Sequence, residues 1–222
     1  MQTYRVVEKF ISINGEGSRA GELSVFIRLA GCNLCCSYCD TAWAWESDCP
    51  GEDMTAAEIL AYIHASGIRN VTLTGGEPLL SANVLKLVQA ITADPELSLE
   101  IETNGSIDIA PFAALPDRPV FTLDYKLPGS GMENKMHRPS FALLGAADVV
   151  KFVCADLADM TRAVEVINEL ALAGRVQIYF SPVFGTIDPS DMVDFMRARR
   201  LNGVRLQLQL HKFIWPPDMR GV

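Results

Sequence analysis

The sequence predicts an α/β fold built around a parallel sheet, and two observations carry this prediction. Short apolar segments of strand length alternate along the chain with segments whose apolar residues recur at helical spacing. Most of the strand segments end in a polar or glycine-containing tip, and right-handed crossovers would bring these tips to one edge of the sheet. Active sites of barrels with this topology lie at the carboxyl ends of the strands. We therefore expect a single site assembled from the strand tips.

The strand segments are short, rich in β-branched residues and bounded by turn residues. The first of them can also be interpreted as an extended arm. The predicted strands are residues 4–13, 23–29, 70–73, 97–101, 120–123, 148–153, 176–180 and 204–210.

Local signals place helices between these strands. Thr55 and Glu58 form a capping box, and Gly67 ends the helix that it begins. A second helix is predicted over residues 84–91 from the spacing of its apolar residues. Asp188, followed by a proline, begins the last helix. Before it, Asp156 caps a helix whose buried stripe is expected to be Leu157, Met160, Val164 and Ile167.

The length and composition indicate one domain over residues 1–222. Within it we expect residues 1–22 to form an N-terminal strand and substrate arm and residues 211–222 to form a C-terminal tail. A net charge of −8 argues against a nucleic-acid partner and favours a small-molecule substrate. We find no signal-like N-terminus and no run of ~18 apolar residues, so we expect no membrane association. Unpaired cysteines favour the reducing cytoplasm.

Four of the six cysteines fall within the segment GCNLCCSYCDT, residues 31–41. A tetrahedral zinc site would need a spacer between the two Cys-x-x-Cys pairs, and there is none. Taken as Cys32-x₃-Cys36-x₂-Cys39, the segment offers three thiolates, whereas a [4Fe-4S] cube normally takes four cysteines. One iron would then be open to a small chelating molecule. A disulfide knot or unrelated buried thiols are less compatible alternatives.

Two polar features precede the cysteines. The turn Asn14-Gly15-Glu16-Gly17 could bring backbone close to a ligand, with Glu16 accepting hydrogen bonds from ring N–H groups, or it could be an ordinary hairpin turn. Arg28 lies within an apolar strand, where it could grip a carboxylate in two places or form a salt bridge at the rim.

Other candidates follow the cysteines. Asp40 and Thr41 could supply oxygen donors to Mg²⁺, and Trp43 and Trp45 could shield the site from water. The glycines of Thr74-Gly-Gly-Glu-Pro78 would expose backbone groups at a strand tip.

The spacing Cys-x₃-Cys-x₂-Cys, with Tyr38 before the third cysteine, resembles the signature of the radical S-adenosylmethionine (SAM) superfamily. The resemblance implies an incomplete barrel of about six parallel strands, a [4Fe-4S] cluster on Cys32, Cys36 and Cys39, and SAM chelated to the open iron. The cofactor then supplies a 5′-deoxyadenosyl radical. Cys35 and Cys49 are extra to the signature, and we interpret Cys35 as a bystander.

A narrower resemblance covers most of the chain. The segments FISINGEG (10–17), VFIRLAGC (25–32) and CDT (39–41), with GGEP, ETNG and the final LHK…RGV, resemble the 7-carboxy-7-deazaguanine synthase family. This implies conversion of 6-carboxy-5,6,7,8-tetrahydropterin to 7-carboxy-7-deazaguanine with loss of ammonia and regeneration of SAM, in queuosine biosynthesis. The alternative is a glycyl-radical activating enzyme, which shares the cysteine spacing but would be expected to lack the Asn-Gly-Glu-Gly arm.

The resemblance also implies roles for single residues. It implies Mg²⁺ at Thr41, an electron donor such as flavodoxin or ferredoxin, and a homodimer. Substrate contacts are implied for Ile13, Asn14, Gly15, Glu16, Arg28 and Thr74. SAM contacts are implied for Gly76, Glu77, Glu102, Asn104, Asp124, Tyr125, Lys126 and Ser181. Two departures stand out: Asn14 replaces a frequent Gln, and Asp124-Tyr125-Lys126 replaces the more usual Ser-Pro-Lys.

Overall fold

A single nine-stranded sheet forms the centre of the computed structural model, which describes residues 2–222. The strand order is β3-β1-β2-β4-β5-β6-β7-β8-β9. From β2 to β9 each strand is parallel to its neighbour, while β1 is antiparallel to both β2 and β3. The strands are β1 (Tyr4–Ile13), β2 (Leu23–Leu29), β3 (Glu52–Met54), β4 (Asn70–Gly75), β5 (Ser98–Thr103), β6 (Val120–Asp124), β7 (Val149–Cys154), β8 (Gln177–Pro182) and β9 (Val204–Leu206).

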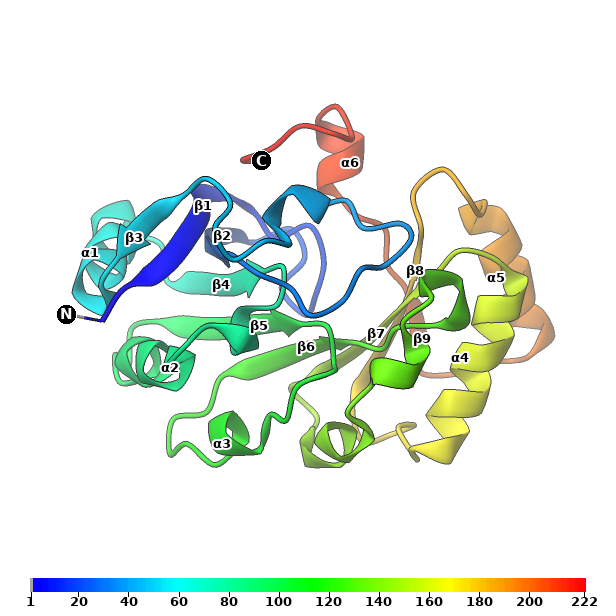
Figure 1. Ribbon diagram of the computed structural model, residues 1–222. Coiled ribbons are helices and arrows are strands. Elements are labelled where there is room, and N and C mark those ends of the chain that lie inside the picture. Colours follow the sequence, from blue (N-terminus) through cyan, green and yellow to red (C-terminus); the bar gives the residue numbers. More distant parts are fainter. Residues whose placement is uncertain (1) are drawn as a thin grey trace.

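Helices cover the outer side of the curved sheet (Figure 1). The α-helices are α1 (Ala56–Ser66), α2 (Val84–Thr92), α3 (Ala110–Ala113), α4 (Leu157–Glu169), α5 (Pro189–Ala198) and α6 (His211–Ile214). Short 3-10 helices are η1 (Ala42–Ala44), η2 (Pro78–Leu80), η3 (Pro128–Ser130), η4 (Glu133–Lys135) and η5 (Arg138–Leu143). The segment that follows β2, and α6 with the C-terminus, lie over the other side of the sheet (Figure 1).

The predicted α/β fold and partial barrel are confirmed, with differences in strand number and length. Seven parallel strands are present where about six were expected, and the short β3 was not foreseen. The last strand was predicted over residues 204–210 but ends at Leu206. Beyond it the backbone leaves the sheet and turns toward the N-terminal arm, where the Leu210 N–H donates to the Gly15 carbonyl over 3.1 Å.

The predicted helix signals are confirmed at α1, α4 and α5. Thr55 and Glu58 form the capping box of α1, Gly67 ends it in the left-handed conformation, and Asp156 and Asp188 cap α4 and α5. The predicted stripe of α4 was partly wrong. Leu157 is 49% exposed, and the buried apolar face is made by Met160, Ala163, Val166 and Ile167. Val164 is only partly buried, although it packs against the core.

Alternation along the parallel strands separates an apolar side from a polar side. Residues such as Leu73, Ile101, Leu123, Val150 and Phe180 are buried in the hydrophobic core. The intervening residues line a cavity on the other side of the sheet, namely Arg28, Thr74, Glu102, Asp124 and Lys151. Three strand pairs place these residues in register, because Arg28 lies opposite Thr74, Glu102 opposite Thr122 and Asp124 opposite Lys151. Within residues 2–222, no helix has the length and apolar character needed to cross a membrane.

Candidate functional site

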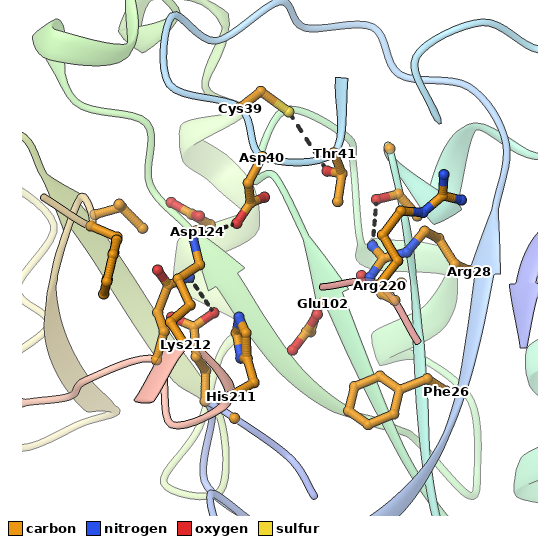
Figure 2. Close-up of a pocket in the computed structure, with 18 of the residues that line it drawn as sticks. Phe26, Arg28, Cys39, Asp40, Thr41, Glu102, Asp124, His211, Lys212 and Arg220 are labelled. Atoms are coloured by element: carbon orange, nitrogen blue, oxygen red, sulfur yellow. Dashed lines mark hydrogen bonds and ion pairs between the residues drawn. The ribbon is translucent and has the colours of Figure 1, made fainter. Parts of the chain in front are cut away.

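A cavity of about 810 Å³ opens at the carboxyl ends of the strands. This volume lies in the range of roughly 300–1,000 Å³ that is usual for small-molecule sites. Figure 2 shows Asp40, Lys212 and His211 on one side of it, Arg28 and Arg220 on the other, and Glu102 between them. The cavity brings together most of the predicted site residues: Ile13, Asn14, Gly15, Glu16, Arg28, Cys32, Cys36, Cys39, Thr41, Thr74, Gly76, Glu102, Asn104, Asp124 and Lys126.

Three residues with implied SAM contacts lie outside this lining. The hydroxyl of Tyr125 donates to Glu133, and its ring packs against Phe141 and Phe152 in the core. The Glu77 carboxylate is fully buried and accepts hydrogen bonds from Thr103, the Asn104 N–H and the Leu79 N–H. Ser181 lies behind Glu16 and donates to the Gln207 carbonyl. The structure therefore places these three side chains in supporting positions around the cavity.

Three of the cysteines on the 31–41 loop face the cavity. Cys32, Cys36 and Cys39 line it, whereas Cys35 is exposed and lies outside the lining. N–H groups surround two of the sulfur atoms: Cys32 Sγ accepts from the Leu34 N–H (3.5 Å) and Asn104 Nδ2 (3.7 Å), and Cys39 Sγ accepts from Trp45 Nε1 (3.2 Å). Hydrogen bonds to sulfur are a recognised means of tuning iron–sulfur clusters.

This donor set fits a three-cysteine cluster. Across residues 2–222, no three His, Cys, Asp or Glu side chains are gathered tightly enough for one metal ion. Ligands of a cube bind different irons and are spaced accordingly. Burial raises the pKa of Cys36 to about 11, so its thiol is neutral until a metal takes the thiolate.

Two buried oxygen atoms in the cavity residues have no partner within the described part of the protein. Asn14 Oδ1 and Asp124 Oδ1 have no hydrogen-bond partner among the described residues, and both residues line the cavity. Buried polar atoms are nearly always hydrogen-bonded. A ligand bound in the cavity would satisfy them, one atom on the arm side and one at the tip of β6.

The glycine pair at the end of β4 holds the cysteine loop close to the sheet. A Cβ at Gly76 would lie 2.4 Å from the Gly31 carbonyl oxygen and 2.7 Å from Cys32 Cβ. The Glu77 N–H donates to the same Gly31 carbonyl over 2.8 Å. A side chain at Gly76 would push the cysteine loop away, so the glycine is required by packing.

The predicted turn at residues 14–17 lies in the connection between β1 and β2, and its residues 14–16 line the cavity. Asn14 Nδ2 donates to Glu100 Oε2 over 3.1 Å, below the cavity floor. The backbone of Gly17 exchanges two hydrogen bonds of 2.9 Å with the Gln207 side chain. Contacts with β5 and with the residues after β9 therefore fix the arm.

Arg28 is paired inside the protein, as the salt-bridge alternative predicted. Its Nε lies 3.0 Å from Glu8 Oε2, and its Nη1 donates to the Gly75 carbonyl over 3.3 Å. Arg220 approaches the other Glu8 oxygen at 3.6 Å and stacks 3.4 Å above the Trp43 ring. Glu8 thus orients two guanidinium groups on the same side of the cavity (Figure 2).

The proposed Mg²⁺ donors lie next to the third cysteine. Thr41 Oγ1 is 3.6 Å from Cys39 Sγ, and the Asp40 carboxylate is 2.9 Å from Lys212 Nζ. Burial acts to raise the pKa of Asp40, but the nearby charge and hydrogen bond of Lys212 act to lower it. The net effect is a pKa below the ordinary value. The carboxylate is therefore ionised, and its protein partner is the Lys212 ammonium.

Charged side chains of both signs occupy the cavity floor. Burial would lower the pKa of Lys126, but Asp124, 2.8 Å away, raises it above its usual value. Burial raises the pKa of Glu102, against the opposing effect of Lys151. The floor therefore presents ammonium and carboxyl groups that are partly desolvated, which favours recognition of a polar ligand.

The sequence left several cavity residues without a role. Lys151, His211, Lys212 and Arg220 all line the cavity. Lys151 carried a local signal, since it is a single charge within an apolar strand. The other three lie in the tail, where no periodic pattern shows which side chains turn inward.

Known proteins were compared with the whole chain. A family model described as the radical SAM superfamily matches residues 26–126. A 7-carboxy-7-deazaguanine synthase from Clostridium acetobutylicum is 53% identical over 219 residues, covering 99% of each chain. One from Chlorobaculum tepidum is 39% identical, covering 98% of this chain and 96% of that protein. The crystal structure of QueE from Escherichia coli matches with a TM-score of 0.73 and 23% identity, over 93% of this chain and 94% of that one, which supports the fold. The arrangement of the site and these full-length relatives agree, and the chain belongs to the 7-carboxy-7-deazaguanine synthase family of the radical SAM superfamily.

Proposed function

We propose that this protein converts 6-carboxy-5,6,7,8-tetrahydropterin to 7-carboxy-7-deazaguanine, with loss of ammonia, on the route to queuosine. The observation that carries the proposal is that one cavity holds the Asn14–Glu16 turn, Arg28 and the three cysteines of the signature. The names of its full-length relatives support the same activity. They favour it over activation of a glycyl-radical protein.

The substrate lies against the arm in this proposal. The Ile13–Glu16 segment offers backbone groups, an unpartnered Asn14 oxygen and the Glu16 carboxylate to the polar edge of a pterin. Arg28 holds the substrate carboxylate. Because Nε and Nη1 already have protein partners, this contact uses the remaining Nη2 or displaces the Gly75 carbonyl. Thr74, in register with Arg28, borders the same region.

The cofactors lie toward the cysteine loop. Cys32, Cys36 and Cys39 would hold the [4Fe-4S] cluster, which together with SAM supplies a carbon-centred radical when bound. Gly76 admits SAM close to the loop, while Asn104, Glu102 and Lys126 offer it polar groups. Asp124 Oδ1, buried without a partner among residues 2–222, is the acceptor best placed to be satisfied by SAM. Phe26, Trp43 and Trp45 restrict water at the cavity wall.

We also propose that Mg²⁺ binds at Thr41, with Asp40 as a neighbouring oxygen donor. Mg²⁺ is usually bound through few protein oxygens and retains several waters, which suits a hydroxyl and a carboxylate beside the substrate. A cation there would offset the negative charge of the pterin carboxylate.

Three further proposals rest on family analogy and on the cysteines. The electron donor is a flavodoxin or ferredoxin, and the protein works as a homodimer. Its cellular location is the reducing cytoplasm, where thiols stay available to iron. Light scattering of the purified protein tests the dimer, and reduction of the cluster by each donor tests the electron source.

The decisive experiment is an anaerobic incubation of reconstituted protein with SAM, Mg²⁺, a reductant and 6-carboxytetrahydropterin, followed by mass spectrometry. The expected result is the mass of 7-carboxy-7-deazaguanine with SAM not consumed in proportion. Cleavage of SAM with intact pterin would contradict the proposed substrate and would direct the search to a protein substrate.

A further inference from the structure

Lys151 is a charged residue in the middle of an apolar strand. β7 has the sequence VVKFVC, and Val150 and Phe152, on either side of Lys151, are completely buried in the core. Since side chains alternate along a strand, Lys151 points to the opposite side of the sheet, where it lines the cavity. A buried ammonium group is costly unless carboxylates neutralise it. Its partners therefore indicate what this lysine does.

Two carboxylates from distant segments converge on Lys151. Its Nζ lies 3.1 Å from Glu16 Oε2, on the N-terminal arm, and 3.8 Å from Asp124 Oδ2, at the tip of β6. The side chains of Lys151 and Glu16 are only 11% and 12% exposed. One lysine thus connects the side of the cavity assigned to the substrate with the side assigned to SAM.

Glu16 depends on such outside contacts, because it lies in the connection between β1 and β2 and not within a strand or helix. Its carboxylate has two other polar neighbours, Ser181 Oγ at 3.4 Å and Gln209 Nε2 at 3.4 Å. The contact with Lys151 is the shortest of the three, and it is the one that carries charge. Charge-assisted hydrogen bonds are roughly twice as strong as neutral ones.

The second lysine of the cavity provides a comparison. Lys126 Nζ lies 2.8 Å from Asp124 Oδ2, and it is close enough to Cys36 for the two groups to influence each other. Lys126 therefore belongs to the part of the cavity next to the cysteine loop. Lys151 shares Asp124 with it but reaches toward the arm.

We propose that Lys151 is a positioning residue, which holds the Glu16 carboxylate against the substrate and ties its position to Asp124. This inference rests on the proposed function of the cavity. Loss of the ammonium would remove the counter-charge that Glu16 and Asp124 share. Asp124 would stay paired with Lys126, whereas Glu16 would keep only the neutral partners Ser181 and Gln209. Glu16 would then move away from the position in which it meets the pterin.

The test compares Lys151→Met, Lys151→Arg, Glu16→Gln and the double variant Lys151→Met/Glu16→Gln in pterin turnover. Misplacement of a substrate-contacting group by about 1 Å can cost on the order of a hundredfold, so a rise in KM of roughly tenfold to a hundredfold is the expected scale. We expect that rise for the pterin in Lys151→Met, with a smaller change in kcat and in SAM cleavage, and partial rescue in Lys151→Arg. The KM of the double variant should be little higher than that of the more affected single variant, since the two single substitutions remove the same interaction. Lys126→Met is the matched control and should reduce SAM cleavage more than pterin affinity.

Multiplicative KM effects of the two single variants would overturn the proposal, as would equal losses of pterin affinity and SAM cleavage in Lys151→Met. A second readout does not depend on turnover. In urea unfolding, Lys151→Met should lower the midpoint, and the added Glu16→Gln should recover part of the loss. If the wild-type protein left the pterin unchanged, the proposed function would fail. The urea midpoints test the Lys151–Glu16 coupling separately, because additive midpoint shifts of the two single variants would reject it.

Discussion

Asn14 Nδ2 donates a hydrogen bond of 3.1 Å to Glu100 Oε2, joining residues 86 positions apart in the sequence. The Glu100 carboxyl group also accepts from Thr122 Oγ1 over 2.5 Å and is only 2% exposed. The Asn14 amide thus joins the arm to β5, while its Oδ1 is buried and has no hydrogen-bond partner among residues 2–222.

The first prediction concerns the titration of Glu100. Burial, with a further contribution from Glu102, raises its pKa to about 7 from an ordinary value of 4.5. When the pKa of a carboxyl group is higher in the folded than in the unfolded state, its protonated form favours folding. This contribution is complete at pH values below the unfolded pKa, and it is lost as the pH rises through the folded pKa. Relative to Glu100→Gln, the unfolding free energy of the wild type should fall on the order of 2 kcal/mol between about pH 5 and about pH 8.

Urea unfolding of both proteins at four pH values within this range measures the difference. The Gln variant keeps the shape of the side chain and removes the titration, so other acidic groups cancel in the comparison. Parallel pH profiles of the two proteins would contradict the raised pKa.

The second prediction concerns Asn14 itself. Asn14→Ala should cost about 1 kcal/mol of stability through the lost hydrogen bond and should raise the pterin KM, because the arm loses its link to β5. Asn70→Ala is the control, since Asn70 is an amide that also donates through Nδ2. Its two acceptors are Glu22 and the Leu23 carbonyl, and all three residues lie outside the cavity lining. An unchanged KM in Asn14→Ala would show that the amide does not set the position of the arm.

The third prediction separates the four clustered cysteines. Cys32→Ala, Cys36→Ala and Cys39→Ala should each lose the spectrum and the iron content of a [4Fe-4S] cluster after reconstitution, because each removes a proposed iron ligand. Cys35→Ala should keep both, since Cys35 is exposed and outside the cavity lining. A cluster-free Cys35→Ala protein would reassign the ligands.

The fourth prediction tests the closure of the cavity by the tail. A Cβ at Gly15 would lie 2.3 Å from His211 Nδ1, so Gly15→Ala should displace α6 and the residues after it. Hydrogen exchange over residues 207–222 should speed up, and the pterin KM should rise. In the double variant Gly15→Ala/His211→Ala, slow hydrogen exchange over residues 207–222 should return, because the imidazole that the new methyl group would meet is absent. Fast exchange in the double variant would show that the steric conflict with His211 is not the cause.

The fifth prediction concerns the proposed Mg²⁺ site. Thr41→Ala should weaken the stimulation of turnover by Mg²⁺ on the order of tenfold, because one oxygen donor is removed. Thr186→Ala is the control, since Thr186 also borders the cavity while its hydroxyl is occupied by the carbonyls of Ala155 and Val183. An identical Mg²⁺ titration of Thr41→Ala and wild type would remove Thr41 from the site.

Local sequence patterns were sufficient to predict much of the architecture. The alternation of strand and helix predicted the parallel sheet, and the cap residues Thr55, Asp156 and Asp188 were found where the sequence placed them. Such signals depend on residues a few positions apart, and for that reason a single sequence contains them. The cysteine spacing is equally local, and it pointed to the superfamily that the comparisons confirm.

The composition of the cavity was decided by contacts between distant segments. Lys151 meets Glu16 across 135 positions, and Gln207 meets Gly17 across 190. Glu8 pairs with Arg28 because β1 and β2 are antiparallel in that register, which an isolated charge in an apolar strand does not reveal. The sequence by itself determined the fold class and the superfamily signature of three spaced cysteines, since both follow from spacing along the chain. Only the tertiary structure decided which charges neutralise one another in the cavity and that the tail lies over it, because packing alone brings those residues within hydrogen-bonding distance.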